Sequence, residues 1–450
     1  MLELIPLAVA VALVASALYF FVGLIPGTDE TSSIAPVILI LVLMNLPPAI
    51  ILAFFMAAIS AMETTNTVPS AIALVPGSTM AIPFVEPCQD IRRLGIPHIA
   101  LRKMLAASVI GSVVALPVAL GMGRVLIPVG TFLKNYIPLI FFIGAIIVAL
   151  ISKARLASVA IIIPFSFFIG ASQKLSVDIT KKSLFIAYFM GIASGPMLID
   201  IISLLSPRLR GILKRKSRTT ITIAAEPKTK TVQPWRVLGT RQATKASIFG
   251  ILSSFIFFLS PVGMTVIFGE IVRKFKGSYL KRSLDRLVVM DAVTNSTYIA
   301  ETIIPLVAIG LPLSPMALGP AAPLFNAPPR FYATETRVEN IHTLLSFSQI
   351  ALFSCIGLLV GLLVSYLLSV GRARKWCKFT LQHVSVEALI ATFIGLAALL
   401  SFYEGGVTGV VAAFSTALLA GLLKRLLDVD LGVLYMAFYA APYVIKAVLR

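Results

Sequence analysis

The stretch DAVTNSTYIAETIIPLVAIGLPLSP, residues 291–315, places three polar groups inside an apolar run. Asp291, Asn295 and Glu301 precede a break formed by Gly310 and Pro312. A charged side chain at the centre of a bilayer costs about 2.5–3.5 kcal/mol on insertion scales, so such groups usually face a partner, a cavity or a transported solute. The stretch therefore predicts a transport site in a membrane-embedded chain.

The composition is that of a membrane protein. Of the 450 residues, 58% are hydrophobic and 13% charged, and the mean hydropathy is +0.98, which no ordinary soluble domain matches. Apolar runs that can cross the hydrocarbon recur along the chain, and we expect about ten to twelve membrane segments. They include Leu4–Leu24, Met104–Leu120, Leu184–Leu205, Ile341–Val370, Leu389–Tyr403 and Val407–Leu423. The pattern predicts an all-α, multi-pass protein of the cell membrane.

The basic residues lie mostly in short loops between the apolar runs. The formal net charge is +19, but this distribution is the positive-inside signature, and it indicates contact with a lipid bilayer rather than with nucleic acid. Three cysteines and three histidines are scattered without metal-ligand spacing. We therefore predict no structural metal, no disulfide framework and no cofactor.

The chain divides into two halves. Residues 206–245 are rich in Lys and Arg and have no long apolar run, so they are predicted to form a basic cytoplasmic linker between transmembrane repeats at 1–205 and 246–450. Breaks recur in the same order at similar offsets: Pro26 and Pro261 at 235, Asn66 and Asn295 at 229, Pro76 and Pro312 at 236. This pattern indicates an internal duplication with discontinuous helices. Whether the repeat is inverted or parallel stays open.

The first half carries a polar cluster like that of the opening stretch. Glu63 and Asn66 are three residues apart, so on a helix they share one face, and the break Pro76-Gly77-Ser78-Thr79 follows. Irregular backbone at membrane depth is tolerated only where it is buried in protein or lines a cavity. We expect the two polar clusters to form one site between the repeats.

Four segments resemble the large permease subunit of the tripartite tricarboxylate transporter family. They are Gly23-Leu-Ile-Pro26-Gly27, Val68-Pro69-Ser-Ala-Ile-Ala-Leu-Val-Pro76-Gly77-Ser78, Asp291-Ala-Val-Thr-Asn295-Ser, and Ile304-Pro305-Leu-Val-Ala-Ile-Gly310-Leu-Pro312. The resemblance implies a duplicated, elevator-type secondary transporter that takes up small carboxylates such as citrate with a cation gradient. It also implies two partners, a small membrane subunit and an extracytoplasmic binding protein. A homodimer is left open.

Carried over residue by residue, the resemblance places one solute-binding loop on Thr65 to Ser78. It places the second on Asp291 to Ser296 together with Gly310 to Ser314. The residues expected to bind the solute are Thr65, Asn66, Pro76, Gly77, Ser78, Thr294, Asn295, Ser296, Gly310, Pro312 and Ser314.

The chemistry of broken helices suggests how such a site works. Backbone amides at a helix N-terminus carry roughly half a positive charge and can hold a carboxylate without a buried cation. Freed carbonyls and Thr or Asn side chains are oxygen ligands that suit Na⁺. Glu63, Asp291 and Glu301 are the candidates for coupling to Na⁺ or H⁺. The alternative for these acids is structural pairing with Lys or Arg.

Two other functions fit a membrane chain. One is translocation of an anionic lipid carrier, such as a polyprenyl phosphate, through the same scaffold. The other is an intramembrane enzyme. Gly191-Ile-Ala-Ser194-Gly195 only partly matches a serine nucleophile motif, and HExxH is absent. The sequence therefore favours a transporter over an enzyme.

Overall fold

The computed structural model describes residues 3–133, 137–152, 154–182, 184–207, 222–225, 233–333 and 338–448. Its first half contains α1 (Leu4–Gly23), α2 (Glu30–Leu43), α3 (Pro48–Thr65), α4 (Thr67–Ala73), the 3-10 helix η1 (Thr79–Phe84), α5 (Val85–Arg93), α6 (Pro97–Leu133), α7 (Ile137–Ile151), α8 (Arg155–Thr180) and α9 (Phe185–Leu205). The second half contains α11 (Pro234–Phe255), α12 (Pro261–Arg273), α13 (Tyr279–Ala308), α14 (Pro315–Leu318), α15 (Ala322–Phe325), α16 (Ile341–Leu344), α17 (Phe347–Ser369), α18 (Ala373–His383), α19 (Val386–Leu427) and α20 (Leu431–Val448).

Helices dominate, as predicted for a multi-pass membrane protein. Among the described residues, seven helices are long and apolar enough to cross a membrane, and three shorter apolar ones accompany them. A small antiparallel pair, β1 (Tyr332–Ala333) and β2 (Val338–Glu339), lies in the loop after α15. The predicted all-α class is confirmed apart from this two-residue ladder.

Helix α19 is a hairpin of two arms rather than one rod. Its backbone leaves helical geometry at Gly405 and Gly406. Beyond this point the chain folds back, and Gly409 comes close to the backbone of Ser401. A Cβ atom added to Gly409 would lie 3.0 Å from the carbonyl carbon of Ser401. The arms correspond to the separate apolar runs Leu389–Tyr403 and Val407–Leu423 of the sequence prediction.

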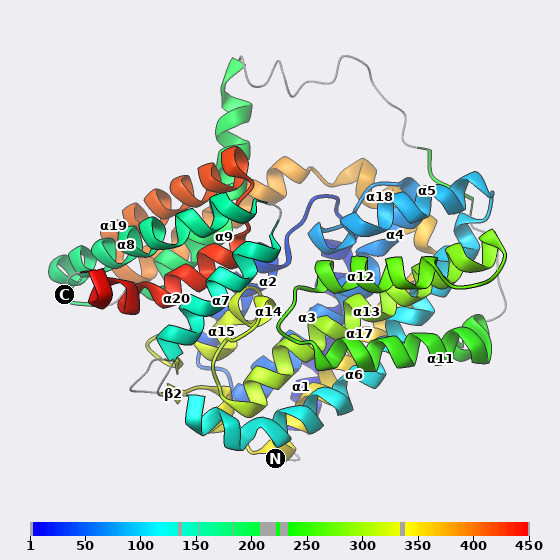
Figure 1. Ribbon diagram of the computed structural model, residues 1–450, viewed down its shortest axis with the longest axis horizontal. Coiled ribbons are helices and arrows are strands. Elements are labelled where there is room, and N and C mark those ends of the chain that lie inside the picture. Colours follow the sequence, from blue (N-terminus) through cyan, green and yellow to red (C-terminus); the bar gives the residue numbers. More distant parts are fainter. Residues whose placement is uncertain are drawn as a thin grey trace.

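The helices form two bundles (Figure 1). The first bundle contains α1, α3, α4, α6, α11, α12, α13 and α17, and the second contains α7, α8, α9, α19 and α20. Short α2, α14 and α15 lie between them: α2 packs on α3 and on α9, and α14 packs on α13 and on α20. Ser32 Oγ on α2 donates to the carbonyl of Ala193 on α9 at 3.0 Å, which ties the bundles together.

Packing in the first bundle is reciprocal between the two halves of the chain. The first-half helix α3 packs on α1 and on the second-half helix α17, while the second-half helix α13 packs on α11 and on the first-half helix α6. Arg286, near the start of α13, lies 3.9 Å from Glu86 on α5, which follows α4. Thr67, at the start of α4, meets Asp291 further along α13, so the contacts follow each other in opposite order along the two segments.

The predicted breaks fall where Gly and Pro interrupt the sequence. Helix α1 ends at Gly23 and α2 begins at Glu30, while α11 and α12 are separated at residues 256–260. Pro26 follows the end of α1, and Pro261 begins α12 in its first turn, where the amide hydrogen that proline lacks is not needed. In the predicted linker, α11 already begins at Pro234, whereas residues 208–221 and 226–232 lie outside the described part of the chain.

One expected loop is a helix. Residues Asp291 to Ser296, predicted as part of the second binding loop, lie inside the 30-residue helix α13. No Gly or Pro occurs between Tyr279 and Ile304, and the polar side chains satisfy the helix itself: Ser296 Oγ donates to the carbonyl of Ala292 at 2.6 Å. Such hydroxyls bond back to the preceding turn without ending the helix. The second break is confined to residues 309–314.

Candidate functional site

The break after α4 brings three distant backbone segments together. Leu74 ends α4 in the left-handed region, with φ 57°, and Ser78 then pairs with Thr28 as a parallel bridge. The amide of Gly77 donates to the carbonyl of Asn66 at 3.1 Å, and that of Thr79 to the carbonyl of Thr28 at 3.2 Å. The amide of Gly77, a residue predicted to bind the solute, and the amide of Thr79 are thus both engaged within the protein.

Asn66 connects the polar face of α3 to this break. Its Nδ2 donates to Glu63 Oε2 at 2.9 Å and to Ser78 Oγ at 3.0 Å. Pro69 supplies no amide hydrogen to the carbonyl of Thr65, so the helix is interrupted at Asn66. The structure therefore brings Asn66 and Ser78, two residues predicted for the first loop, together with the acid Glu63.

Thr67 joins the two halves of the site. Its Oγ1 donates to Asp291 Oδ2 on α13 at 3.3 Å. Asn295 Nδ2 donates to Asp291 Oδ1 at 3.1 Å and to the Asp291 carbonyl at 3.0 Å, and Ser112 Oγ on α6 lies 3.5 Å from Asn295 Oδ1. The expectation that Glu63 and Asn66 meet Asp291 and Asn295 in one cluster agrees with this geometry.

The second break surrounds Glu301. The amide of Met316 donates to Glu301 Oε2 at 3.1 Å, and Ser314 Oγ donates to the Glu301 carbonyl while it caps α14. Gly310 takes φ +73°, which favours glycine, and its carbonyl accepts from Asn340 Nδ2 at 2.8 Å. Pro312 lies buried between them.

Thr65, Thr294 and Ser296 do not share this cluster. Thr65 Oγ1 bonds to the carbonyl of Ala61 at 2.9 Å within its own helix. Thr294 Oγ1 lies 2.5 Å from Thr265 Oγ1 on α12, and Ser296 Oγ donates to the carbonyl of Gly111 on α6 at 3.0 Å. These hydroxyls serve the helix backbone and the contacts between helices.

Four carboxyl groups are buried, and none of them has a cationic partner among the described residues. Glu30, Glu63, Asp291 and Glu301 are at most 2% exposed, and none of the ion pairs within the described residues involves them. The predicted alternative of Lys or Arg pairing is therefore not what the described residues show. A charge buried without a partner is costly, so such groups bind a proton or a cation.

Several buried oxygen atoms around these acids have no hydrogen-bond partner. The carboxyl groups of Glu30 and Asp291 lie close enough to Glu63 to repel a negative charge on it. Tyr298 is likewise close to the carboxyl groups of Glu30, Glu63 and Glu301. The oxygens without a partner are Glu30 Oε1, Glu63 Oε1, Asn66 Oδ1, Thr297 Oγ1, Tyr298 OH and Glu301 Oε1. Carboxylate, amide and hydroxyl oxygens are the donor set of hard cations such as Na⁺.

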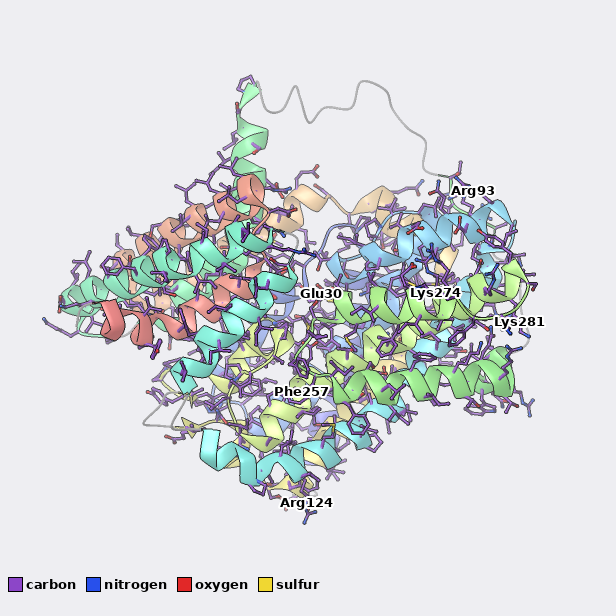
Figure 2. All side chains as sticks on the ribbon, in the orientation of Figure 1. Glu30, Arg93, Arg124, Phe257, Lys274 and Lys281 are labelled. Carbon is purple, nitrogen blue, oxygen red and sulfur yellow. The ribbon has the colours of Figure 1, made fainter. Side chains whose placement is uncertain are left out.

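Sequence reasoning missed Glu30 and Thr67 as members of the site. Glu30 follows the break after α1, begins α2 and accepts from Thr79 Oγ1 at 2.8 Å. Figure 2 shows Glu30 near the middle of the molecule, where the two bundles meet. An acid directly after a Pro-Gly break in an apolar context was the available signal.

The match to a protein family settles what kind of protein carries this site. Residues 9–434 match the model of the Tripartite tricarboxylate transporter TctA family. The chain belongs to the TctA family. It is therefore a component of a membrane transport system, which agrees with the predicted absence of enzyme activity. A search of curated proteins and a search of solved structures found no match.

The TctA match also bears on partners and metals. The family description names a tripartite system, which supports partner subunits in general. Within the described residues, no group of three or more His, Cys, Asp or Glu side chains is placed to hold a metal ion.

Proposed function

We propose that the chain is a secondary active transporter of small organic anions, such as di- or tricarboxylates, coupled to Na⁺ or H⁺. The observation that carries this proposal is the contact between the two polar clusters. Asn66 binds Glu63, and its neighbour Thr67 donates a hydrogen bond to Asp291. It unites buried acids from both halves of the chain, and no ion pair of the described residues joins them to Lys or Arg. Transport, rather than structure, explains why such acids are kept there.

The charge balance of the cluster makes cation coupling a physical requirement. A di- or tricarboxylate that approaches Glu63 and Asp291 adds negative charge to a site of low dielectric, where repulsion is strong. Binding of H⁺ or Na⁺ offsets that charge before or together with the anion. Glu63, Asp291 and Glu301 are the proposed coupling residues, and Glu30 joins them.

The anion itself would be held by neutral donors near the breaks. Hydroxyl and amide groups of Asn66, Ser78, Asn295 and Ser314 surround the acids, and each is already placed by a hydrogen bond. Rearrangement of these bonds exposes donors to a carboxylate. The name of the TctA family supports tricarboxylates as the first solutes to test.

The reciprocal packing supports an inverted repeat. The contacts Thr67–Asp291 and Glu86–Arg286 follow each other in opposite order along the two halves, and α3 and α13 are each covered by a helix from the other half. Secondary transporters with inverted repeats bind substrate where the repeats meet and alternate access by moving one body against another. The two bundles, joined through α2 and α14, are the bodies that an elevator movement would displace.

Counterflow of labelled citrate into proteoliposomes tests the proposal. Vesicles preloaded with unlabelled citrate are expected to accumulate the label, and an inward Na⁺ or proton gradient is expected to drive net uptake. A panel of dicarboxylates defines the solute class. Addition of the small membrane subunit and the binding protein tests whether they are required. Movement of a polyprenyl phosphate across the bilayer, without any carboxylate flux, would instead favour the lipid-carrier alternative.

A further inference from the structure

A small pocket of about 90 Å³ lies where α12 ends and α13 begins. Side chains of α5, α12 and α13 line it, and three of them are arginines. The lining includes Arg273, Arg282, Arg286, Tyr279, Ser283 and Asp90. A pocket of this volume has room for several water molecules, so it can take one group of the size of a phosphate.

Two of the arginines share the acids around the pocket. Arg286 Nη2 donates to Glu270 Oε1 at 2.7 Å, and Arg273 Nε lies 3.0 Å from Oε2 of the same carboxylate. Glu86 is 3.9 Å from Arg286, and its side chain is 71% exposed, so water weakens this contact. Glu270 and Glu86 therefore offset at most the charge of these two arginines.

Arg282 adds a positive charge that no acid of the described chain pairs with. It lines the pocket from the start of α13, and it enters none of the ion pairs among the described residues. Asp90, the acid of the lining, lies 3.9 Å from Arg93. Figure 2 shows Arg93, Lys274 and Lys281 at this same end of the first bundle. The pocket therefore carries a surplus positive charge within a basic surface.

The contacts of α11 show on which side of the membrane α13 begins. Lys245 of α11 pairs with Asp285, near the start of α13. Further along both helices, a Cβ added to Gly250 would lie 2.7 Å from Ser296 Oγ. The two contacts follow the same order along α11 and α13, which indicates a parallel course. The start of α13 therefore lies on the side where α11 begins.

Helix α12 returns to that same side. Its contacts with α13 follow the reverse order, because Thr265 meets Thr294 and the later Glu270 meets Arg286. The end of α12, where the pocket lies, is therefore on the side where α11 begins. Helix α11 begins within the basic stretch at 206–245, which the positive-inside rule assigns to the cytoplasm.

An exposed apolar face of α12 leads to the pocket. Val266, Ile267 and Ile271 are between 42% and 47% exposed, and Ile267 and Ile271 are four residues apart, so they share one face of the helix. Arg273 follows them as the last residue of α12. In a bilayer such a face meets acyl chains, and a basic residue at the helix end meets the headgroups.

We propose that this pocket binds the phosphate of an anionic phospholipid in the cytoplasmic leaflet. The phosphate pairs with Arg282, the hydroxyl groups of Tyr279 and Ser283 donate to it, and an acyl chain lies along Ile267 and Ile271. Basic pockets between membrane helices on the cytoplasmic side are suited to lipid headgroups. A soluble anion would meet the same charge but would leave the apolar face of α12 unused. The site does not depend on the proposed transport function.

Thermal unfolding in a mild detergent tests the pocket. Added phosphatidylglycerol is expected to raise the unfolding midpoint of the purified chain, whereas phosphatidylcholine, which has no net charge, is not. Arg282→Gln is expected to raise the half-stabilising concentration of phosphatidylglycerol about tenfold. Lys281→Gln, the same change at an exposed neighbour outside the lining, is expected to leave it unaltered. An equal loss in both variants overturns the pocket in favour of diffuse attraction to the basic surface.

A soluble headgroup separates the two sources of phosphate. Glycerol phosphate, which lacks the acyl chains, is expected to leave the unfolding midpoint unchanged at concentrations at which the lipid acts. Stabilisation by glycerol phosphate as strong as that by the lipid overturns the lipid assignment in favour of a soluble anion.

A second measurement needs no variant. Mass spectrometry of the intact wild-type chain, released from micelles that contain equal amounts of phosphatidylglycerol and phosphatidylcholine, counts the lipids that stay bound. Bound phosphatidylglycerol is expected to exceed phosphatidylcholine, and Arg282→Gln is expected to remove the excess. Equal retention of the two lipids by the wild-type chain overturns the site.

Discussion

Thr67 and Asp291 are 224 residues apart in the sequence, and they meet with 3.3 Å between Oγ1 and Oδ2. This hydrogen bond is the point where the polar face of the first half meets that of the second. It is formed inside the first bundle, where Thr67 and Asp291 are both almost completely buried. A site that depends on it must respond to changes on either side of the contact.

Loss of the Thr67 hydroxyl is expected to impair uptake. Thr67→Val keeps the shape and removes the donor to Asp291, and a bond to a charged acceptor contributes about 1.5–3 kcal/mol, or roughly 10- to 100-fold in rate or affinity. Thr67→Ser keeps the donor and is the matched control. Citrate uptake by proteoliposomes measures both. Equal uptake by the two variants would show that the bond is dispensable.

Glu63→Gln is expected to separate exchange from coupling. Glutamine preserves the acceptor for Asn66 but cannot carry a negative charge, so it cannot bind H⁺ or attract Na⁺. Uptake driven by a cation gradient should fall, while counterflow without a gradient persists. Glu270→Gln, at an acid that pairs with Arg273 and Arg286, serves as the control. Unchanged cation dependence in Glu63→Gln would remove this residue from the coupling set.

Asn295→Ala is expected to abolish uptake and to leave membrane insertion intact. The amide positions the Asp291 carboxyl through Nδ2, and alanine is well tolerated in a helix. Detergent size-exclusion profiles report folding, and counterflow reports activity. Wild-type counterflow would exclude Asn295 from the site.

Gly77→Ala is expected to force the first break apart. A Cβ at this position would lie 2.5 Å from the carbonyl oxygen of Gly23 and 2.9 Å from Cα of Asn66, and overpacking of this kind costs about 1–3 kcal/mol. Thermal stability and uptake should both decrease. Gly121→Ala, in α6 with nothing within 4 Å of the added atom, is expected to change neither. A stable, active Gly77→Ala chain would contradict the described close approach.

The native thiols of Cys88 and Cys377 are expected to react slowly. Burial, with a further effect of the Asp291 charge, raises the pKa of Cys88, and burial raises the pKa of Cys377 to about 12. The thiolate is the reactive form, so both thiols stay protonated at neutral pH and gain reactivity only as the pH rises. Maleimide labelling of the folded chain between pH 7 and pH 9, compared with the denatured chain, measures this. Fast labelling at pH 7 would show that the thiols are accessible.

The sequence was sufficient for features that depend on local chemistry. Long apolar runs predicted membrane helices, and Pro with Gly located the breaks near Gly23, Pro76, Pro261 and Pro312. Glu63 and Asn66 were predicted on one face because three residues span nearly one helical turn. Each of these follows from neighbours along the chain.

Features that depend on distant contacts could not be predicted. The resemblance placed a solute-binding loop on Asp291 to Ser296, yet here the side chains of Asn295 and Ser296 bond to the preceding turn of a helix. The bond between Glu30 and Thr79, which lie 49 residues apart, could not be predicted from neighbours along the chain. The reciprocal covering of α3 and α13 likewise requires three-dimensional knowledge of both halves.

The two glycines at the tip of α19 let the chain reverse its direction between the two arms. If the 42 residues of α19 formed an uninterrupted rod, it would be about 63 Å long, twice the hydrocarbon thickness. During insertion, the turn at Gly405 and Gly406 instead returns the chain to the side from which it came. A substitution for Gly406, whose φ is +59°, would disfavour that return. Misplacement of α20 during biogenesis, rather than loss of a binding group, is the defect that such a change would cause.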